Sequence, residues 1–195
     1  VACLVYGASL DAPFTFDDEN NITLNPGIRL NAADPSSWTG LYLWIPTPRP
    51  VANASFALNY AAGGLEVSGY RAVNVAIHIL SSLVVALLSW LGTGVLARRS
   101  GTEADAASGR SVRLGFAAFA GLVFVAHPLA TQSVTYVVQR MTSLSTLFYV
   151  VALCLWIGGG GAQRAGGSAL RWRVSAVVAW LLAMGSKEIA ATWPV

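Results

Sequence analysis

Charged residues are scarce in this sequence. Of its 195 residues, 11% are Asp, Glu, Lys or Arg and 55% are hydrophobic, whereas soluble domains usually carry roughly 25% charge. The shortage of charge argues against an ordinary soluble domain and is typical of a membrane protein. The sequence also lacks a basic stripe interleaved with aromatic residues, so we expect no nucleic-acid partner.

Cysteine and the short metal-binding and nucleotide-binding motifs are also rare. The two cysteines, Cys3 and Cys154, stand alone in apolar runs, where isolated thiols specify neither a disulfide nor a metal site. The sequence has no CxxC, HExxH or Walker glycine pattern, and its consecutive glycines at 158–161 are typical of a linker. The motifs therefore predict no set of metal ligands.

Long apolar runs are present instead. The clearest has no charged residue between Ala72 and Leu96, and a helix needs ~20 mostly apolar residues to cross a bilayer. Residues 114–135, 141–158 and 174–185 are similar, although the last run is short. These runs predict an all-α fold, a polytopic bundle of transmembrane helices with a long first external loop.

The charges separate between the segments that connect these runs. Seven of the twelve Lys and Arg residues lie in two segments, Arg98, Arg99, Arg110 and Arg113 in one and Arg164, Arg171 and Arg173 in the other. Short cytoplasmic loops are enriched in Lys and Arg, which predicts that both segments are cytoplasmic. Six of the nine acidic residues then lie on the opposite, periplasmic or lumenal side, in the first external loop.

We interpret the chain as an internal piece of one membrane domain. The expected segments are the end of a first transmembrane helix (1–10), a long external loop (11–69), a transmembrane helix (70–97), a cytoplasmic loop (98–113), a transmembrane helix (114–131), an external loop (132–140), a transmembrane helix (141–158), a cytoplasmic loop (159–173), a transmembrane helix (174–186) and an external loop that begins the next helix (187–195). Trp38, Tyr42 and Trp44 suit a segment lying along the membrane surface.

The acidic stretch FTFDDENN contains Asp17, Asp18 and Glu19 in succession. One interpretation is a solvated turn or a helix N-cap. Another is a general base or a metal site, because closely spaced carboxylates can shift a pKa or hold a hard cation. The position alone leaves both interpretations open.

Other polar residues are predicted to gather at the same face of the membrane. They are Arg49, Arg71, His127, Gln139, Arg140, Lys187 and Glu188. Ionisable groups near membrane depth are costly and are functional candidates by default. His78, with Asn74 one turn earlier, suits interhelical packing at least as well as catalysis, and His127 suits either a helix end or a site.

This mixture of carboxylates and cations has a chemical use. A sugar carried on a lipid phosphate needs cations that stabilise the phosphate as it leaves, and an acceptor hydroxyl needs a carboxylate base that takes its proton. Arginine suits the first task because its planar guanidinium matches phosphate oxygens. An apolar groove between helices would hold the lipid tail.

Four motifs together resemble a known family. They are FTFDDENNITLNPGI, RPVANASFALNYAAGGLEVSGYRAVNVAIHIL, FVAHPLATQSVTYVVQRMTSLSTLFY and LLAMGSKE, in this order. The series resembles the transmembrane O-mannosyltransferases that end in tetratricopeptide repeats, and particularly their bacterial relatives. The resemblance covers nearly the whole chain, and its specificity lies in the series rather than in any one motif.

The resemblance implies a GT-C-type glycosyltransferase that uses a polyprenyl-phosphate sugar and transfers to an acceptor on the external side. It implies that the long external loop is catalytic, with Asp17 and Asp18 as candidates for the catalytic carboxylate and Asp18 preferred. Arg49, Arg140 and Lys187 match basic positions of the shared motifs, and their charge predicts that they contact the phosphate.

The chain departs from this family in two places. Animal members have an acid shortly after the arginine of the third motif, whereas this chain reads QRMTSL, so that acid has no counterpart. The tetratricopeptide repeats, with their ~34-residue period, are absent from these 195 residues and are expected beyond them.

We therefore expect an enzyme of a bacterial inner membrane, multi-pass, with its active site on the periplasmic side. The predicted site consists of Asp18 and Asp17 as general base, with Arg49, Arg140, Lys187, His127, Glu188 and Gln139 as substrate-binding residues. The donor carries mannose or another hexose, the acceptor is a protein hydroxyl, and a divalent metal is left open. Two alternatives involve no catalysis: a transporter or flippase for lipid-linked sugars, and a membrane scaffold carrying a tetratricopeptide repeat domain.

Overall fold

The computed structural model describes residues 1–2, 6–30, 34, 36–37, 49–101 and 106–192. Within these ranges every regular element is a helix. Three stretches, Val67–Arg99, Ser108–Ala126 and Val137–Arg164, are long and apolar enough to cross a membrane. The predicted all-α helical bundle is confirmed.

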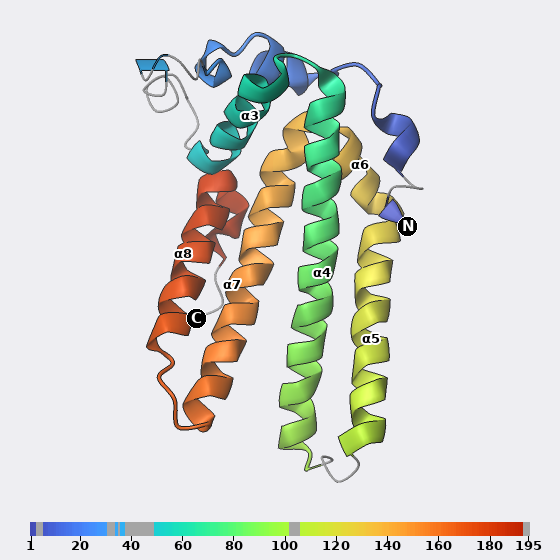
Figure 1. The fold of residues 1–195 in the computed structure, drawn as a ribbon, viewed down its shortest axis with the longest axis vertical. Helices are drawn as coiled ribbons and strands as arrows, with labels where there is room; N and C mark the ends of the chain where they lie inside the picture. The colour runs from blue at the N-terminus through green and yellow to red at the C-terminus, as the bar shows by residue number, and fades with distance from the viewer. Residues whose placement is uncertain (3–5, 31–33, 35, 38–48, 102–105, 193–195) are drawn as a thin grey trace.

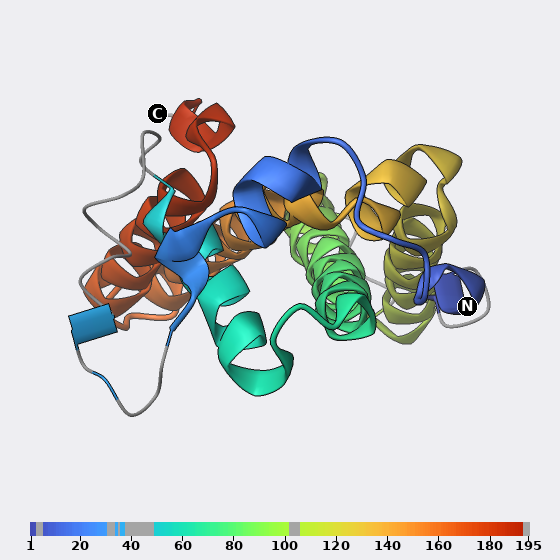
Figure 2. The same cartoon turned by 90° about the horizontal axis from the view of Figure 1, so that it is seen from above.

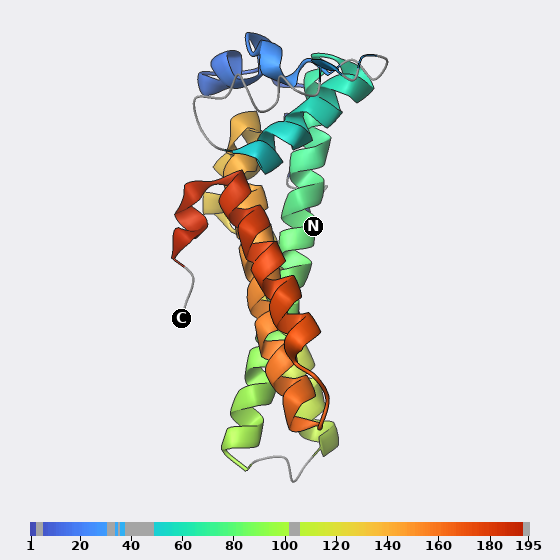
Figure 3. The same cartoon turned by 90° about the vertical axis from the view of Figure 1, so that its left-hand side faces the viewer.

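Four long helices form the body of the molecule. They are α4 (Val67–Arg99), α5 (Ala106–Ala126), α7 (Arg140–Arg164) and α8 (Leu170–Ser186). Helix α7 packs against both α8 and α4, and α4 packs against α5, so the helices stand in a row in the order α8, α7, α4, α5 (Figure 1). Seen from the side, this row is a single layer (Figure 3).

The outer surfaces of this layer are apolar. Leu83 of α4, Phe119 of α5, Trp156 of α7 and Leu181 of α8 are all exposed. In water, so much exposed apolar surface would favour association with another surface, whereas hydrocarbon accommodates it. The exposed side chains and the long apolar helices together place the protein in a membrane.

The helix boundaries differ from the expected loops. Helix α7 continues to Arg164, so the glycines at 158–161 lie within a helix and their assignment to a linker is wrong. The reason is packing, because a Cβ atom at Gly159 would lie only 2.9 Å from Cβ of Trp172 on α8. Likewise α5 begins inside the expected 98–113 loop.

Helix α8 is the element for which the sequence predicted a fourth span. It has 17 residues, which gives a length of about 26 Å at ~1.5 Å per residue, at the short end of the range for a transmembrane helix. It packs along α7. A membrane crossing by α8 stays a prediction.

Short elements cover one end of the row, which we call the capped end (Figures 1 and 2). They are η1 (Gly7–Ser9), η2 (Glu19–Thr23), η3 (Pro26–Ile28), α3 (Pro50–Gly63), η6 (Pro128–Ala130), α6 (Thr131–Thr135), η7 (Val137–Gln139) and η8 (Glu188–Ala191). Their apolar core includes Ile22, Ile28, Phe56, Tyr70 and Val137. Burial of these side chains fixes the covering segments onto the ends of α4 and α7.

Two expectations fall partly or wholly outside the described residues. Trp38, Tyr42 and Trp44 lie in the range 38–48, which the structure does not describe. Residues 3–5 of the expected first helix end are also outside it, and the described part contains η1. Both assignments stay predictions.

Candidate active site at the capped end

Asp18 is buried at the start of η2 and joins the acidic segment to η7. Its Oδ1 atom accepts a hydrogen bond from the backbone N–H of Val138 at 2.7 Å, and Oδ2 accepts one from the N–H of Thr15 at 3.2 Å. Burial raises the pKa of this carboxyl, and the hydrogen bonds from Val138 and Thr15 oppose that shift. Both carboxylate oxygens of Asp18 are therefore engaged in holding the backbone.

Asp17 has the opposite environment. Its residue is exposed, while its backbone N–H donates a hydrogen bond to the hydroxyl of Tyr136 at 2.9 Å. The preceding residue, Phe16, has a φ of 49°, in the left-handed region that non-glycine residues rarely adopt. The turn thus holds the backbone of Asp17 in place and leaves its carboxylate at the surface.

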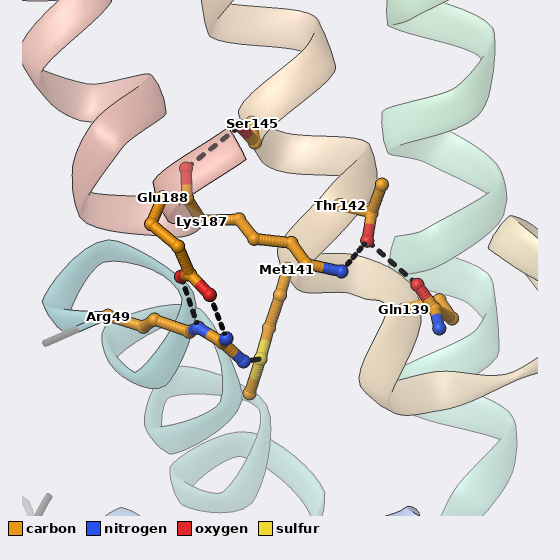
Figure 4. A network of polar contacts seen from close by, with 7 residues as sticks. All are labelled: Arg49, Gln139, Met141, Thr142, Ser145, Lys187 and Glu188. Atoms are coloured by element: carbon orange, nitrogen blue, oxygen red, sulfur yellow. Dashed lines mark hydrogen bonds and ion pairs between the residues drawn. The ribbon is translucent and has the colours of Figure 1, made fainter. Parts of the chain in front are cut away.

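Lys187 has an extended backbone conformation between α8 and η8, and its side chain points toward α7 (Figure 4). Its Nζ atom donates a hydrogen bond to Oγ1 of Thr142 at 2.8 Å, and that hydroxyl donates to Oε1 of Gln139 at 2.7 Å. The hydroxyl of Ser145 donates to the carbonyl of Lys187 at 3.4 Å. Among the described residues, no carboxylate lies within salt-bridge distance of the Lys187 ammonium.

Arg49 and Glu188 form a two-point ion pair beside Lys187 (Figure 4). Nη2 of Arg49 lies 2.6 Å from Oε1 of Glu188, and Nε lies 3.0 Å from Oε2. Hydrogen bonding to Arg49 lowers the pKa of Glu188 to about 2. The charge of Arg49 is therefore largely neutralised, and the pair joins the start of α3 to the start of η8.

Arg140 is enclosed where three helices meet. Its side chain is fully buried, and it donates hydrogen bonds to Oδ1 of Asn74 and the carbonyl of Tyr70, both at 2.7 Å, and to the carbonyl of Ser55 at 3.2 Å. Its guanidinium also lies over the ring of Phe56 at 4.7 Å. These contacts lock α3, α4 and α7 together, and the direct phosphate contact expected of Arg140 stays a prediction.

His127 and His78 border a cavity of about 310 Å³ between α4, α5 and α7. His127 caps η6, where its Nδ1 accepts a hydrogen bond from the N–H of Leu129 at 3.2 Å, and its side chain is exposed. His78 is buried, stacks on Phe124 and contacts the edge of Tyr6. The packing interpretation of His78 fits this environment.

Hydroxyl groups that are not among the predicted site residues line this cavity. They belong to Ser81, Ser133, Thr142, Ser143 and Thr146. A second cavity of about 210 Å³ lies between α7 and η8 and shares Thr146. The signal in the sequence was the repeated Ser and Thr of MTSLST at the start of an apolar helix, where hydroxyls are otherwise unfavourable.

The turn η7 connects the acidic segment with the Lys187 network. Tyr136 and Val138 hold Asp17 and Asp18, while Gln139 at the end of the same turn accepts from Thr142. Within the described residues, no group of three or more His, Cys, Asp or Glu side chains could hold a metal ion. Asp17 and Lys187 thus each contact the segment 136–142, Asp17 at Tyr136 and Lys187 at Thr142. The question of a divalent metal stays untested.

Comparison with known proteins shows which proteins this chain is similar to. No family model and no solved structure matches the chain. Human protein O-mannosyl-transferase TMTC4 is 29% identical over 162 residues, which cover 78% of this chain and 21% of that protein. Drosophila melanogaster protein O-mannosyl-transferase Tmtc3 is 29% identical over 178 residues, covering 84% of this chain and 19% of that protein. The chain is thus distantly similar to these TMTC proteins.

Human TMTC1 gives the same result, with 29% identity over 163 residues, 77% of this chain and 16% of that protein. The chain spans roughly a fifth or less of the length of these TMTC relatives. The similarity supports the family predicted from the motifs.

Proposed function

We propose that this protein is a membrane glycosyltransferase of the GT-C type that acts at the capped end. It transfers mannose or another hexose from a polyprenyl-phosphate donor to a protein hydroxyl on the periplasmic side of a bacterial inner membrane. The similarity to proteins named O-mannosyl-transferases supports the class of reaction. The charge difference between the two ends of the bundle supports the side.

One observation carries the proposal. An exposed carboxylate, Asp17, and an ammonium group without a carboxylate partner among the described residues, Lys187, are both held by contacts to the segment 136–142. A sugar transfer from a phosphate needs these two groups near one another, a base for the acceptor and a cation for the leaving phosphate.

Asp17 is the base in this proposal and Asp18 is a positioning residue. The carboxylate of Asp18 is buried with both oxygens bound to backbone N–H groups, whereas that of Asp17 is at the surface. An incoming acceptor hydroxyl can reach only the exposed one. This reverses the preference for Asp18 that the motif alone suggested.

The reaction is a substitution at the anomeric carbon of the sugar. The acceptor oxygen forms a bond to that carbon while the bond from carbon to phosphate oxygen breaks, and its electron pair leaves with the polyprenyl phosphate. The acceptor proton passes to the carboxylate of Asp17. Lys187 stabilises the charge that develops on the phosphate, because a preorganised cation in a partly buried site needs little reorganisation.

The two cavities beside Lys187 suit the donor. Their hydroxyl groups, with His127 and Gln139, can bind the sugar hydroxyls, and Thr146 belongs to both cavities. The apolar outer faces of the row of helices can carry the polyprenyl chain, which would extend into the bilayer. The Arg49–Glu188 pair acts indirectly by holding the segment that presents Lys187.

Transfer from a labelled donor tests the proposal. Membranes containing the full-length protein are incubated with radiolabelled polyprenyl-phosphate mannose and a protein acceptor, and label in the protein fraction is measured. We expect label on protein hydroxyls and release of polyprenyl phosphate. If the labelled lipid crosses the membrane intact and no polyprenyl phosphate is released, the protein is a flippase and the proposal is wrong.

A further inference from the structure

A separate cavity lies at the end of the bundle opposite to the candidate active site. Its volume is about 410 Å³, and its walls come from the last turns of α4 and α7 and the first turns of α5 and α8. Three arginines line it: Arg98, Arg113 and Arg164. A smaller neighbouring cavity of about 270 Å³ is lined by Arg99 together with Arg98 and Arg164.

Two buried N–H donors in the wall of the larger cavity have no partner. They are Nε of Arg113 and Nε1 of Trp172. Leaving a buried donor unpaired costs about 1–3 kcal/mol, and such groups are rare in native structures. Both residues line the cavity, while these two atoms are themselves covered by neighbouring protein atoms.

A glycine on α4 makes room for the side chain of Arg113 in the cavity wall. Arg113 reaches from α5 across to α4, donates to the carbonyl of Trp90 at 2.9 Å and lies over the Trp90 ring at 4.3 Å. Its guanidinium occupies the space above Gly94, where a Cβ atom would collide with Nη2 and lie 3.0 Å from Cζ of Arg113. Glycine at this position is therefore what allows Arg113 to face the cavity.

The electrostatics of this end favour an anion. All the acids of the described ranges belong to the capped end, since they lie at or before Glu66 or at Glu188. Glu103 and Asp105, in the connection between α4 and α5, lie outside the described residues. The four arginines of the two cavities outnumber these two acids, so the end carries a net positive charge.

The position of the cavity relative to the membrane indicates which kind of anion would bind there. It lies where two candidate spans end, so its arginines and tryptophans are at the level of the lipid headgroups. Its deeper wall is apolar, with Leu91, Val95 and Ile157. A free anion would gain nothing from that wall, whereas a lipid would place its headgroup on the arginines and its chains along the helices.

We propose that this cavity binds an anionic phospholipid of the bilayer, with the headgroup phosphate among the guanidinium groups of Arg98, Arg113 and Arg164 that line it. Basic pockets between transmembrane helices are suited to such headgroups. The bound lipid would bridge α4, α5, α7 and α8 at this end.

Quenching of tryptophan fluorescence tests this site, because Trp90 and Trp172 line it. Full-length protein in phosphatidylcholine nanodiscs is titrated with brominated phosphatidylglycerol, and a Trp90→Phe/Trp172→Phe variant identifies the signal from the cavity. We expect quenching at a low mole fraction of brominated phosphatidylglycerol. In the double variant Arg113→Gln/Arg164→Gln, we expect the mole fraction of brominated phosphatidylglycerol that gives half-maximal quenching to rise. The rise should be about fivefold for each of the two arginines removed.

Two variants control for general charge and for folding. Arg110→Gln/Arg173→Gln removes the same charge from the same end outside the cavity and should leave the titration unchanged. Gly94→Ala keeps every charge but displaces Arg113 and should weaken binding with the rest of the fold intact. The proposal is overturned if brominated phosphatidylcholine quenches equally well, if the control weakens binding as much, or if millimolar inorganic phosphate displaces the lipid, which would indicate a free-anion site.

Discussion

The amide nitrogen of Val138 lies 2.7 Å from Oδ1 of Asp18. This contact joins residues that are 120 positions apart in the chain and binds the acidic segment to the turn η7. The same turn leads through Gln139 and Thr142 to Lys187. A single short turn therefore determines where the proposed base stands relative to the proposed phosphate contact.

The two adjacent aspartates should differ in their effect on stability. Asp18→Ala leaves the N–H of Val138 buried without an acceptor, so we expect the free energy of unfolding to fall by about 1–3 kcal/mol. Asp17→Ala removes an exposed carboxylate and should change it by no more than about 0.5 kcal/mol. Denaturation of the purified full-length protein in detergent measures both, and equal losses would contradict the burial of Asp18.

Substitution of Lys187 should lower kcat more than substitution of Thr142. Lys187→Gln removes the cation at the phosphate and should lower kcat by about 10²–10³-fold, the size seen when one transition-state contact is lost. Thr142→Val keeps the shape but removes the hydroxyl that holds Nζ of Lys187, so we expect a smaller loss.

The control for this pair is Thr142→Ser, which retains the hydroxyl and should restore most of the activity. Steady-state kinetics with a polyprenyl-phosphate donor separate kcat from KM. If Thr142→Ser is as impaired as Thr142→Val, the hydroxyl does not act by positioning Lys187.

Arg140 should behave as a residue that holds helices together. Arg140→Gln loses hydrogen bonds to Asn74, Tyr70 and Ser55, and we expect the free energy of unfolding to fall by about 2–5 kcal/mol. The KM for the donor, measured on the folded fraction, should not change. A raised KM at unchanged stability would instead support the phosphate contact predicted from the sequence.

The Arg49–Glu188 pair should make a small, pH-dependent contribution to stability. The pKa of Glu188 is lowered from 4.5 to about 2 by hydrogen bonding to Arg49. A carboxyl with a depressed pKa stabilises the fold above its unfolded value of about 4.5, and this contribution is lost as the pH falls through about 2. It is modest because Glu188 is 62% exposed.

Thermal unfolding of wild type and Glu188→Gln as a function of pH measures this effect. The difference in unfolding temperature should be constant above pH ~4.5 and shrink toward pH ~2. Glu19→Gln, an exposed acid at the same end, serves as the matched control. A difference that grows as the pH falls would have the wrong sign for this ion pair.

The helical bundle could be predicted from the sequence because it depends on local composition. A run such as 72–96 is apolar for long enough to span a bilayer whatever the rest of the chain does, and helix α4 is found there. Lys187, Gln139, Glu188 and Arg49 lie at the capped end of the bundle, and their placement at the external face of a membrane stays a prediction.

The individual environments could not be predicted because they depend on contacts between distant segments. Asp17 and Asp18 are neighbours in the sequence, yet Tyr136 and Val138 decide which one is buried. Arg140 resembles any basic residue at a membrane face until Asn74 and Tyr70 enclose it. The glycines at 158–161 suggested a linker because the sequence does not show Trp172 packing on Gly158 and Gly159.

The most direct test compares Asp17→Asn with Glu19→Gln in the full-length protein. Both substitutions remove one exposed carboxylate from the same segment, and transfer of labelled mannose from a polyprenyl-phosphate donor to protein is measured for each. We expect Asp17→Asn to lose transfer by at least about 10²-fold, the lower end of what a general base contributes, while Glu19→Gln remains close to wild type. Full transfer by Asp17→Asn would contradict the assignment of Asp17 as the base.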